Sequence, residues 1–293
     1  MNTCRLTPMD SHLRSAPRSA LLTELRRRRG HSVCSYIPYS VIVLTSFALS
    51  TASALSAPLL RPPAAAVAPP APAPPTQPQP ESLYVHLPFC RRRCSYCDFA
   101  IVPTGPKPSD FLMESYVSSL CDEIRQLGGR PDVPPGGGGG GVGPLPTLRT
   151  VYFGGGTPSL VPTHLLRRIL DAVAEIFDLS HVVEMTLECD PGTFDAGYLR
   201  RARSLGFGRV SLGTQFLHPD AARGDAVLAS LGRTHSTADA RDAIGAVAAA
   251  GIGNWSADLI CGLPGVTPAD WAACLSQAAD ARPDHISVYD LQV

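Results

Sequence analysis

Three cysteines stand close together in this chain, Cys90, Cys94 and Cys97, directly after a short apolar run. This spacing is typical of a metal site, whereas the other cysteines are scattered singly and do not resemble a disulfide framework. Four-iron clusters are normally held by cysteine thiolates, and three thiolates would leave one iron open to another ligand. An open position is what a catalytic metal centre needs. A zinc site with His86 as the fourth ligand is the alternative.

Other polar or glycine-rich motifs stand where expected strands end. Gly154–Ser159 reads Gly-Gly-Gly-Thr-Pro-Ser, and its glycines would let a ligand approach the backbone without interference from Cβ atoms, although a tight turn is the structural alternative. Glu184 and Glu188 share a face of one strand, and Glu188 lies nearer the C-terminal rim, either as a ligand contact or as a solvated charge. Asp258 lies within an apolar strand, where a charge is costly unless it is partnered, which favours a ligand-facing role.

Strands and helices alternate behind these motifs. We expect strands at 83–87, 148–153, 183–189, 209–213, 254–260 and 285–289, and helices at 110–127, 164–177, 194–205, 237–250 and 268–281. Such alternation predicts an α/β fold with a parallel sheet, right-handed crossovers and helices on its outer side. The strands are fewer than a closed barrel needs, so we expect a partial (β/α)6 TIM-like barrel with its chemistry at the C-terminal ends of the strands. Asp110 is expected to cap the first helix.

Residues 1–80 are expected to be leader and linker, not fold. Their first part is rich in Arg and Ser with few acids, the composition of an organelle transit peptide. Ile37–Leu60 has nearly the length of a membrane span, but its small polar residues and lack of charged flanks on the C-terminal side argue against an anchor. The Ala/Pro/Gln tract at Pro58–Pro80 predicts an extended linker.

Residues 81–293 are expected to form the folded domain, with a glycine-rich surface insertion at 131–146. The sequence ends directly after an expected strand that needs packing on both faces, so we expect a C-terminal domain to be missing. Lys and Arg together number 25, as do Asp and Glu, so no net field favours a nucleic acid or an anionic membrane as partner. The remaining cysteines in apolar patterns are expected to behave as small hydrophobic residues: Cys121, Cys189, Cys261 and Cys274.

The Cys-x3-Cys-x2-Cys loop after Tyr84–Phe89 resembles the radical S-adenosylmethionine (SAM) superfamily, and most closely the oxygen-independent coproporphyrinogen III oxidase family with its heme-chaperone branch. The resemblance runs from about Ser82 to Val293. It implies that the three cysteines hold a [4Fe–4S] cluster and that SAM binds beside it. The SAM contacts that it implies are Tyr84, Tyr96, Gly155, Gly156, Thr157, Glu188 and Asp258, together with Gln215 and Arg233 at the site of a second SAM. The stretch between Gln215 and Arg233 is several residues longer than in the family, which leaves open that Arg233 is an ordinary surface arginine.

The residues after Cys97 separate the two branches of this family. The oxidase branch has another cysteine two residues after the third ligand, whereas this chain has Asp98 and Phe99, an ending typical of the heme-chaperone branch. The resemblance thus implies a SAM-cleaving protein of tetrapyrrole metabolism that delivers heme, with an oxidative decarboxylase of coproporphyrinogen III as the second hypothesis and a zinc-binding module as the third. The partners implied are heme or another tetrapyrrole, an electron donor such as ferredoxin or flavodoxin, and a heme-acceptor protein. The Ala/Pro-rich leader favours a chloroplast over a mitochondrion.

Overall fold

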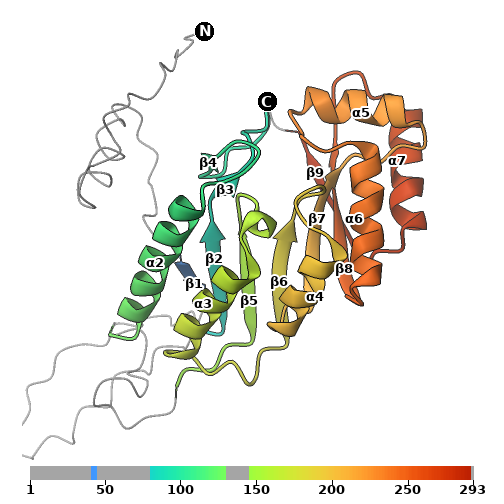
Figure 1. Ribbon diagram of the computed structural model, residues 1–293. Coiled ribbons are helices and arrows are strands. Elements are labelled where there is room, and N and C mark those ends of the chain that lie inside the picture. The colour runs from blue at the N-terminus through green and yellow to red at the C-terminus, as the bar shows by residue number, and fades with distance from the viewer. Residues whose placement is uncertain (1–40, 45–79, 130–144, 292–293) are drawn as a thin grey trace, which may run out of the picture. The chain divides into compact units, whose positions relative to one another are not determined.

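A sheet of parallel strands, extended by one antiparallel strand, runs through the described part of the chain (Figure 1). The computed structural model describes residues 41–44, 80–129 and 145–291, which all lie in one compact unit, Ser40–Val293. The strand order is β1-β2-β5-β6-β7-β8-β9, and all neighbours pair in parallel except β1 and β2. The parallel order from β2 to β9 follows the sequence, as expected for successive right-handed crossovers.

The elements of the sheet and its crossovers follow one another along the chain. The strands are β1 (Val41–Leu44), β2 (Ser82–Leu87), β5 (Thr150–Gly155), β6 (Glu184–Cys189), β7 (Arg209–Gln215), β8 (Asn254–Cys261) and β9 (His285–Asp290). The helices are α2 (Asp110–Leu127), α3 (Thr163–Ala174), α4 (Ala196–Ser204), α5 (Ala221–Ser230), α6 (Thr237–Ala249) and α7 (Pro268–Asp280), with a 3₁₀ turn η2 (Pro158–Leu160). A small pair of strands, β3 (Phe89–Cys90) and β4 (Val102–Pro103), closes the cysteine loop.

The two faces of the sheet differ because side chains alternate along each strand. Along β2, Leu83, Val85 and Leu87 are buried, whereas the residues between them are half-buried. Val151 and Phe153 of β5 continue the buried face. The buried face is apolar and packs against helices. The opposite face carries most of the polar side chains that form the site described below.

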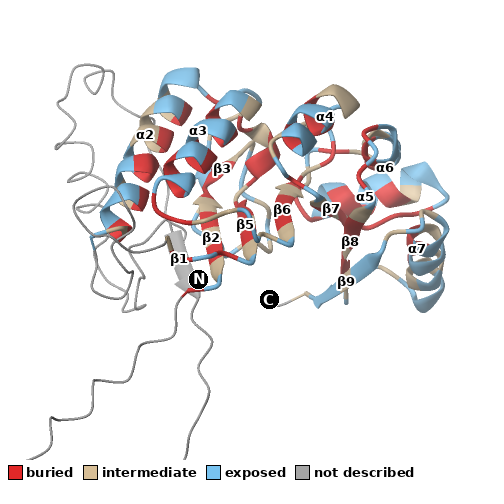
Figure 2. Cartoon of the chain, turned by 90° about the horizontal axis from the view of Figure 1, so that it is seen from below, coloured by how far each residue is buried: buried red, intermediate tan, exposed pale blue. Residues whose placement is uncertain are grey.

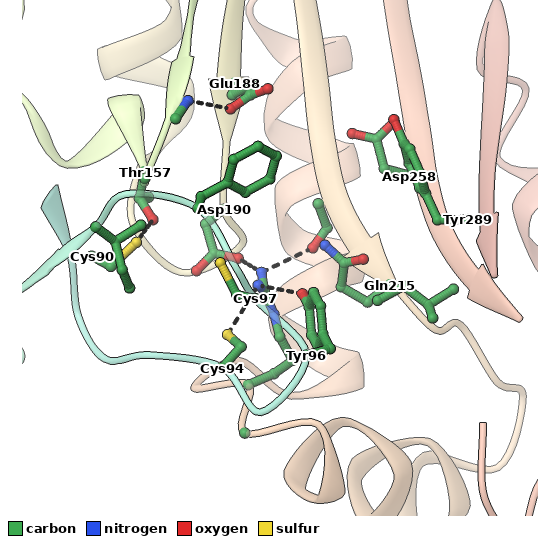
Figure 3. A pocket seen from close by; sticks show the side chains of 18 of the residues that line it. Cys90, Cys94, Tyr96, Cys97, Thr157, Glu188, Asp190, Gln215, Asp258 and Tyr289 are labelled. Carbon is green, nitrogen blue, oxygen red and sulfur yellow. Dashed lines mark hydrogen bonds and ion pairs between the residues drawn. The ribbon is translucent and has the colours of Figure 1, made fainter. Parts of the chain in front are cut away.

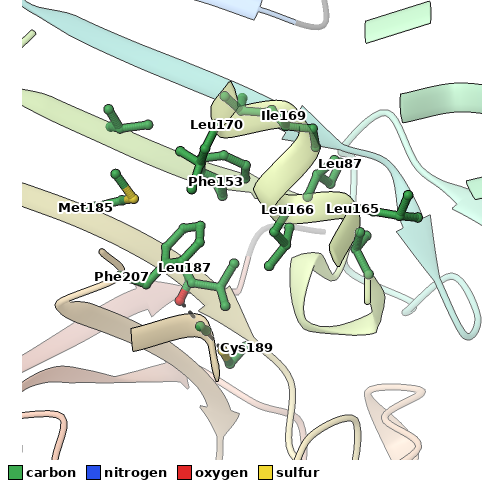
Figure 4. Packing of buried hydrophobic residues seen from close by; sticks show 14 of the residues in the cluster. Leu87, Phe153, Leu165, Leu166, Ile169, Leu170, Met185, Leu187, Cys189 and Phe207 are labelled. Carbon is green, nitrogen blue, oxygen red and sulfur yellow. Dashed lines mark hydrogen bonds between the residues drawn. The ribbon is translucent and has the colours of Figure 1, made fainter. Parts of the chain in front are cut away.

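Helices α2, α3, α4 and α6 cover the apolar face, with their buried sides toward the strands (Figure 2). Leu87 and Phe153 from the strands lie in one cluster with Leu166 and Ile169 of α3 (Figure 4). Phe153 also meets Phe207 edge to face, with ring centroids 5.0 Å apart. Each fully buried side chain of this kind stabilises the fold by roughly 1.5–3 kcal/mol. The site can therefore be polar, because the apolar face of the sheet provides the core.

The expected α/β fold with a partial six-stranded parallel sheet is confirmed. The expected helix at 110–127 has these bounds, but Asp110 does not cap it: Ser109 is the N-cap residue, and Asp110 lies in the first turn, where a negative charge favours the positive end of the helix. Cys121, Cys189 and Cys274 are buried as expected. Cys261 is not, because its thiol is partly exposed and donates a 2.7 Å hydrogen bond to Asp290.

Strand β1 and helix α5 were not expected from the sequence. Strand β1 comes from the stretch assigned to the leader and pairs with the open edge of β2, where unpaired backbone groups would otherwise be exposed. The rest of residues 1–79 and most of the glycine-rich insertion lie outside the described residues, as does most of the apolar stretch considered as a membrane span. Among the described residues, none of the helices is both long and apolar enough to cross a membrane.

Candidate functional site

A pocket of about 640 Å³ opens at the carboxyl ends of the parallel strands (Figure 3). Its wall includes the cysteine loop, the Gly155–Pro158 turn after β5, and the last residues of β6 to β9. This is the edge where parallel α/β folds place their ligands. Its volume lies within the range of cavities that enclose a small-molecule cofactor.

The three cysteines of the loop all line this pocket. Backbone hydrogen bonds hold the loop at its base and in its middle: Val102 N–H donates to Pro88 O at 2.8 Å, and Ser95 N–H donates to Leu231 O at 3.1 Å. The Cys90 thiol and the Thr157 hydroxyl lie within 3.4 Å, which joins the loop to the turn after β5. The pKa of Cys90 is raised to about 11, chiefly by burial and also by Cys97 and Cys94, while the Thr157 contact acts to lower it. The three thiols are thus close enough for their ionisations to oppose one another.

Both nitrogens of the His86 ring have partners outside the cysteine set. Nε2 lies 2.8 Å from Ala100 O, and Nδ1 lies 3.2 Å from the Tyr84 hydroxyl. These contacts count against His86 as the fourth ligand of a zinc site.

The glycines after β5 are required by close packing. A Cβ atom on Gly156 would lie 2.6 Å from the backbone of Pro88 and Phe89, and one on Gly155 would lie 2.5 Å from the His86 ring. Gly155 also has a φ of +113°, which other residues rarely adopt. The turn therefore brings bare backbone to the pocket wall beside Cys90, where a ligand can reach it. Thr157, the next residue, also lines the pocket.

A half-buried carboxylate, Glu188, lies in the pocket wall near the end of β6. It accepts hydrogen bonds from the Tyr152 hydroxyl at 2.7 Å and from the Gly155 N–H at 3.0 Å. Burial raises its pKa, the two hydrogen bonds lower it, and nearby Asp258 raises it. Glu188 is thus a preorganised acceptor, not a solvated rim charge.

Asp258 of β8 lies on the same face two strands away and also lines the pocket. Its Oδ2 accepts a 2.7 Å hydrogen bond from Ser211, and its Oδ1 accepts one from Ser256 at 3.3 Å. The strand register places Glu188 beside Ser211, and Ser211 beside Ser256. The hydroxyls of Ser211 and Ser256 therefore provide hydrogen-bond partners for the Asp258 carboxylate within its apolar strand.

Comparison with known proteins assigns these features to a family. Residues 144–278 match the family model of the radical SAM superfamily. Over 216 residues the chain is 43% identical to a protein of Synechocystis named heme chaperone HemW, covering 72% of this chain and 47% of that protein. It is 32% identical over 213 residues to heme chaperone HemW of Lactococcus lactis, covering 73% of this chain and 49% of that protein. The chain belongs to the radical SAM superfamily.

A solved structure agrees with this radical SAM fold. Coproporphyrinogen III oxidase HemN of Escherichia coli, described as a radical SAM enzyme, has a TM-score of 0.58 and 24% identity, over 71% of this chain and 43% of that chain. At this identity the similarity concerns the fold alone. The chain spans about half the length of the curated relatives that it matches.

Radical SAM membership implies a [4Fe–4S] cluster and bound SAM, and the residues present fit both. Three thiols line one wall of the pocket, and the glycine turn beside them keeps backbone accessible. Of the predicted SAM contacts, these line the same pocket: Tyr96, Gly155, Gly156, Thr157, Glu188, Gln215, Arg233 and Asp258. Their individual roles toward SAM stay predictions.

Tyr84 is the predicted contact that does not line the pocket. Its ring stacks on Tyr152 with centroids 6.0 Å apart, and its hydroxyl meets His86. Burial raises the pKa of Tyr84, and Glu188 raises it further, so the ring lies close behind that carboxylate. Tyr84 therefore lies beside Tyr152, the residue that donates to Glu188.

Gln215 precedes helix α5 in the sequence, and Arg233 follows it. Gln215 is the last residue of β7 and has a φ of +62°, which is unusual for a residue other than glycine. It lies at an irregularity in the pairing with β8, and such irregularities often redirect a side chain toward a site. Arg233 is not a surface arginine, because its side chain is only 11% exposed. Helix α5 lies in the stretch between the two, and both residues line the pocket.

Sequence reasoning missed several residues that shape the site. Tyr152 and Ser211 are the neutral partners of the two carboxylates, and the two-residue period of their strands was the available signal. Asp190 follows Glu188 by two residues and lines the pocket, so the same period would have indicated it. His235, two residues after Arg233, left no such signal because it lies in a loop.

Proposed function

We propose that this chain is the radical SAM part of a heme chaperone, which binds heme and delivers it to acceptor proteins. The observation that carries the proposal is the 43% identity to heme chaperone HemW of Synechocystis across 72% of this chain. The residues Asp98 and Phe99 after Cys97 support it, because the oxidase branch has an additional cysteine there.

The pocket would serve this function by holding the cofactors in fixed positions. Cys90, Cys94 and Cys97 would hold the cluster, and the bare backbone of Gly155 and Gly156 would lie against SAM. Glu188, already fixed by two donors, would accept hydrogen bonds from ribose hydroxyls. A bound cluster supplies the electron that cleaves SAM.

Heme binding is tested first, on the anaerobically reconstituted full chain. Hemin is titrated in, and the absorbance of bound heme is followed. We expect saturable binding, followed by transfer to a heme-free acceptor protein when one is added. Failure to bind hemin above the level of an unrelated protein would contradict the proposal.

Coproporphyrinogen III separates the chaperone from the oxidase. The same preparation is incubated anaerobically with this substrate, SAM and a chemical reductant, and the products are separated by chromatography. We expect SAM cleavage without decarboxylated product. Formation of protoporphyrinogen IX would replace the chaperone proposal by the oxidase.

Two parts of the proposal concern the cell. A reduced ferredoxin or flavodoxin is proposed as the electron donor, since the cluster needs a low-potential electron.

The Arg- and Ser-rich leader supports delivery to an organelle, with the chloroplast favoured over the mitochondrion. A fusion of residues 1–80 to a fluorescent reporter tests this, and a reporter spread through the cytosol would contradict it.

A further inference from the structure

Asp190, Arg233 and His235 form a cluster of charged and polar side chains against the wall of the pocket. The exposed fractions of these side chains are 15%, 11% and 0%, respectively. Asp190 follows β6, whereas the other two follow α5. Neither Asp190 nor His235 is among the SAM contacts that the family resemblance implies.

The guanidinium of Arg233 is held on both of its terminal nitrogens. Nη1 donates to the Tyr96 hydroxyl at 3.1 Å and lies 3.5 Å from the Cys94 thiol. Nη2 donates to Asp190 and to Gly213 O at 3.2 Å. Burial acts to lower the pKa of Arg233, but Asp190, Tyr96 and Cys94 raise it to a greater extent, so the group stays a cation.

Asp190 is itself anchored by neighbours that do not bind Arg233. Its N–H donates to Ser159 Oγ at 3.1 Å, and its carbonyl oxygen accepts from Thr193 Oγ1 at 2.7 Å. Its Oδ1 also faces the fully buried His235 ring, 3.4 Å from Nδ1. The other ring nitrogen, Nε2, lies 3.3 Å from Thr214 O. The carboxylate therefore has a fixed place between Arg233 and His235.

We propose that Asp190 is a positioning residue which, packed against His235, holds the guanidinium of Arg233 beside Cys94 and Tyr96, where SAM meets the cluster loop. A long arginine side chain has many rotamers, and a buried cation without its partner is strongly disfavoured. Asp190 removes both problems at once, so the guanidinium of Arg233 keeps one place at the pocket wall. The inference rests on the SAM binding that the proposed function includes.

The test compares SAM affinity with stability in the reconstituted full chain. Asp190→Asn is measured beside Asp270→Asn, because Asp270 pairs with Arg223 at 2.7 Å away from the pocket. We expect Asp190→Asn to keep iron and sulfide but to raise the dissociation constant for SAM about tenfold or more. The electron paramagnetic resonance change that SAM causes in the reduced cluster should then need correspondingly more SAM. Asp270→Asn should lower the unfolding temperature and leave SAM affinity unchanged.

A double-mutant cycle shows whether Asp190 acts through Arg233. Arg233→Lys keeps the positive charge but loses the planar guanidinium, whose several N–H groups donate to different partners at once. We expect the dissociation constant of the double variant for SAM to be no higher than that of whichever single variant binds SAM less tightly. Additive losses, or an unchanged affinity in Asp190→Asn, would overturn the inference. If Asp190→Asn fails to fold, His235→Gln takes its place in the cycle and should raise the dissociation constant by a smaller factor.

Failure of this inference is distinguishable from failure of the proposed function. The cycle measures SAM binding alone, so a chain that binds SAM but no heme would contradict the chaperone proposal and leave the role of Asp190 testable in the same experiment. A wild-type chain that binds no SAM would overturn both.

Discussion

The Tyr152 hydroxyl donates a 2.7 Å hydrogen bond to Oε1 of Glu188, across the neighbouring strands β5 and β6. The Gly155 N–H holds the other oxygen, so one carboxylate joins the glycine turn to the next strand. The bond from Tyr152 lowers the pKa of Glu188, in opposition to burial, which raises it. Tyr152 therefore helps to keep this carboxylate available as an acceptor.

Replacing Tyr152 by phenylalanine should weaken SAM binding, most clearly at acid pH. Without the hydroxyl the pKa of Glu188 rises further, so the carboxylate becomes protonated at a higher pH as the pH falls. We expect the loss of SAM affinity on acidification to begin at higher pH in Tyr152→Phe than in the wild type. Equilibrium dialysis with SAM across a pH series measures this. Tyr198→Phe is the control, since Tyr198 is buried in α4 and donates to Val161 O away from the pocket.

Glu188→Gln should make the cofactor-free chain more stable at neutral pH. Because the folded pKa of Glu188 is raised, the folded state binds this proton more tightly than the unfolded state. The wild type should therefore lose stability as pH rises from about 4.3, the value for an unperturbed Glu, to the raised folded pKa. Thermal unfolding at several pH values should show Glu188→Gln above the wild type at neutral pH, with the gap closing on acidification.

Gly156→Ala should destabilise the chain and impair the turn beside Cys90. The added Cβ would lie 2.6 Å from the backbone of Pro88 and Phe89, which cannot move without shifting the cysteine loop. Overpacking of this kind costs about 1–3 kcal/mol, measured by denaturant unfolding. Gly245→Ala is the matched control, because a Cβ there in helix α6 meets nothing within 4 Å and should stabilise by about 0.5–1 kcal/mol. Equal stability of the two variants would show that the turn is looser than described.

The sequence predicts most of the sheet and much of the pocket because strand alternation is a local signal. Helix α5 was missed because its pattern is weak and contains Gly224, whose role is tertiary: a Cβ there would lie 2.4 Å from the Thr237 hydroxyl. The short strand β1 was missed for a similar reason, since it is defined by pairing with β2.

Contacts between distant residues were the least predictable part of the site. Arg233 matched a family position, but its burial and its ion pair with Asp190 depend on how the segment with α5 folds back over the cysteine loop. Tyr84 also matches a family position, and the structure pairs it with Tyr152 on the neighbouring strand, so its role toward SAM stays a prediction. Sequence spacing selects the face of a strand but not which side chain reaches the ligand.

Replacement of any one loop cysteine should abolish the cluster, whereas a buried cysteine elsewhere should not matter to it. Cys97→Ser leaves two thiolates, and a cubane held by so few ligands should be lost or incompletely assembled. We expect anaerobically reconstituted Cys97→Ser to lose most of its iron and sulfide and the absorbance of a cubane. Cys121→Ala, on the buried face of α2, should cost stability but retain wild-type iron and sulfide. An unchanged cluster after all three loop cysteines are replaced would show that this loop is not its ligand, and the assignment of the pocket would fail with it.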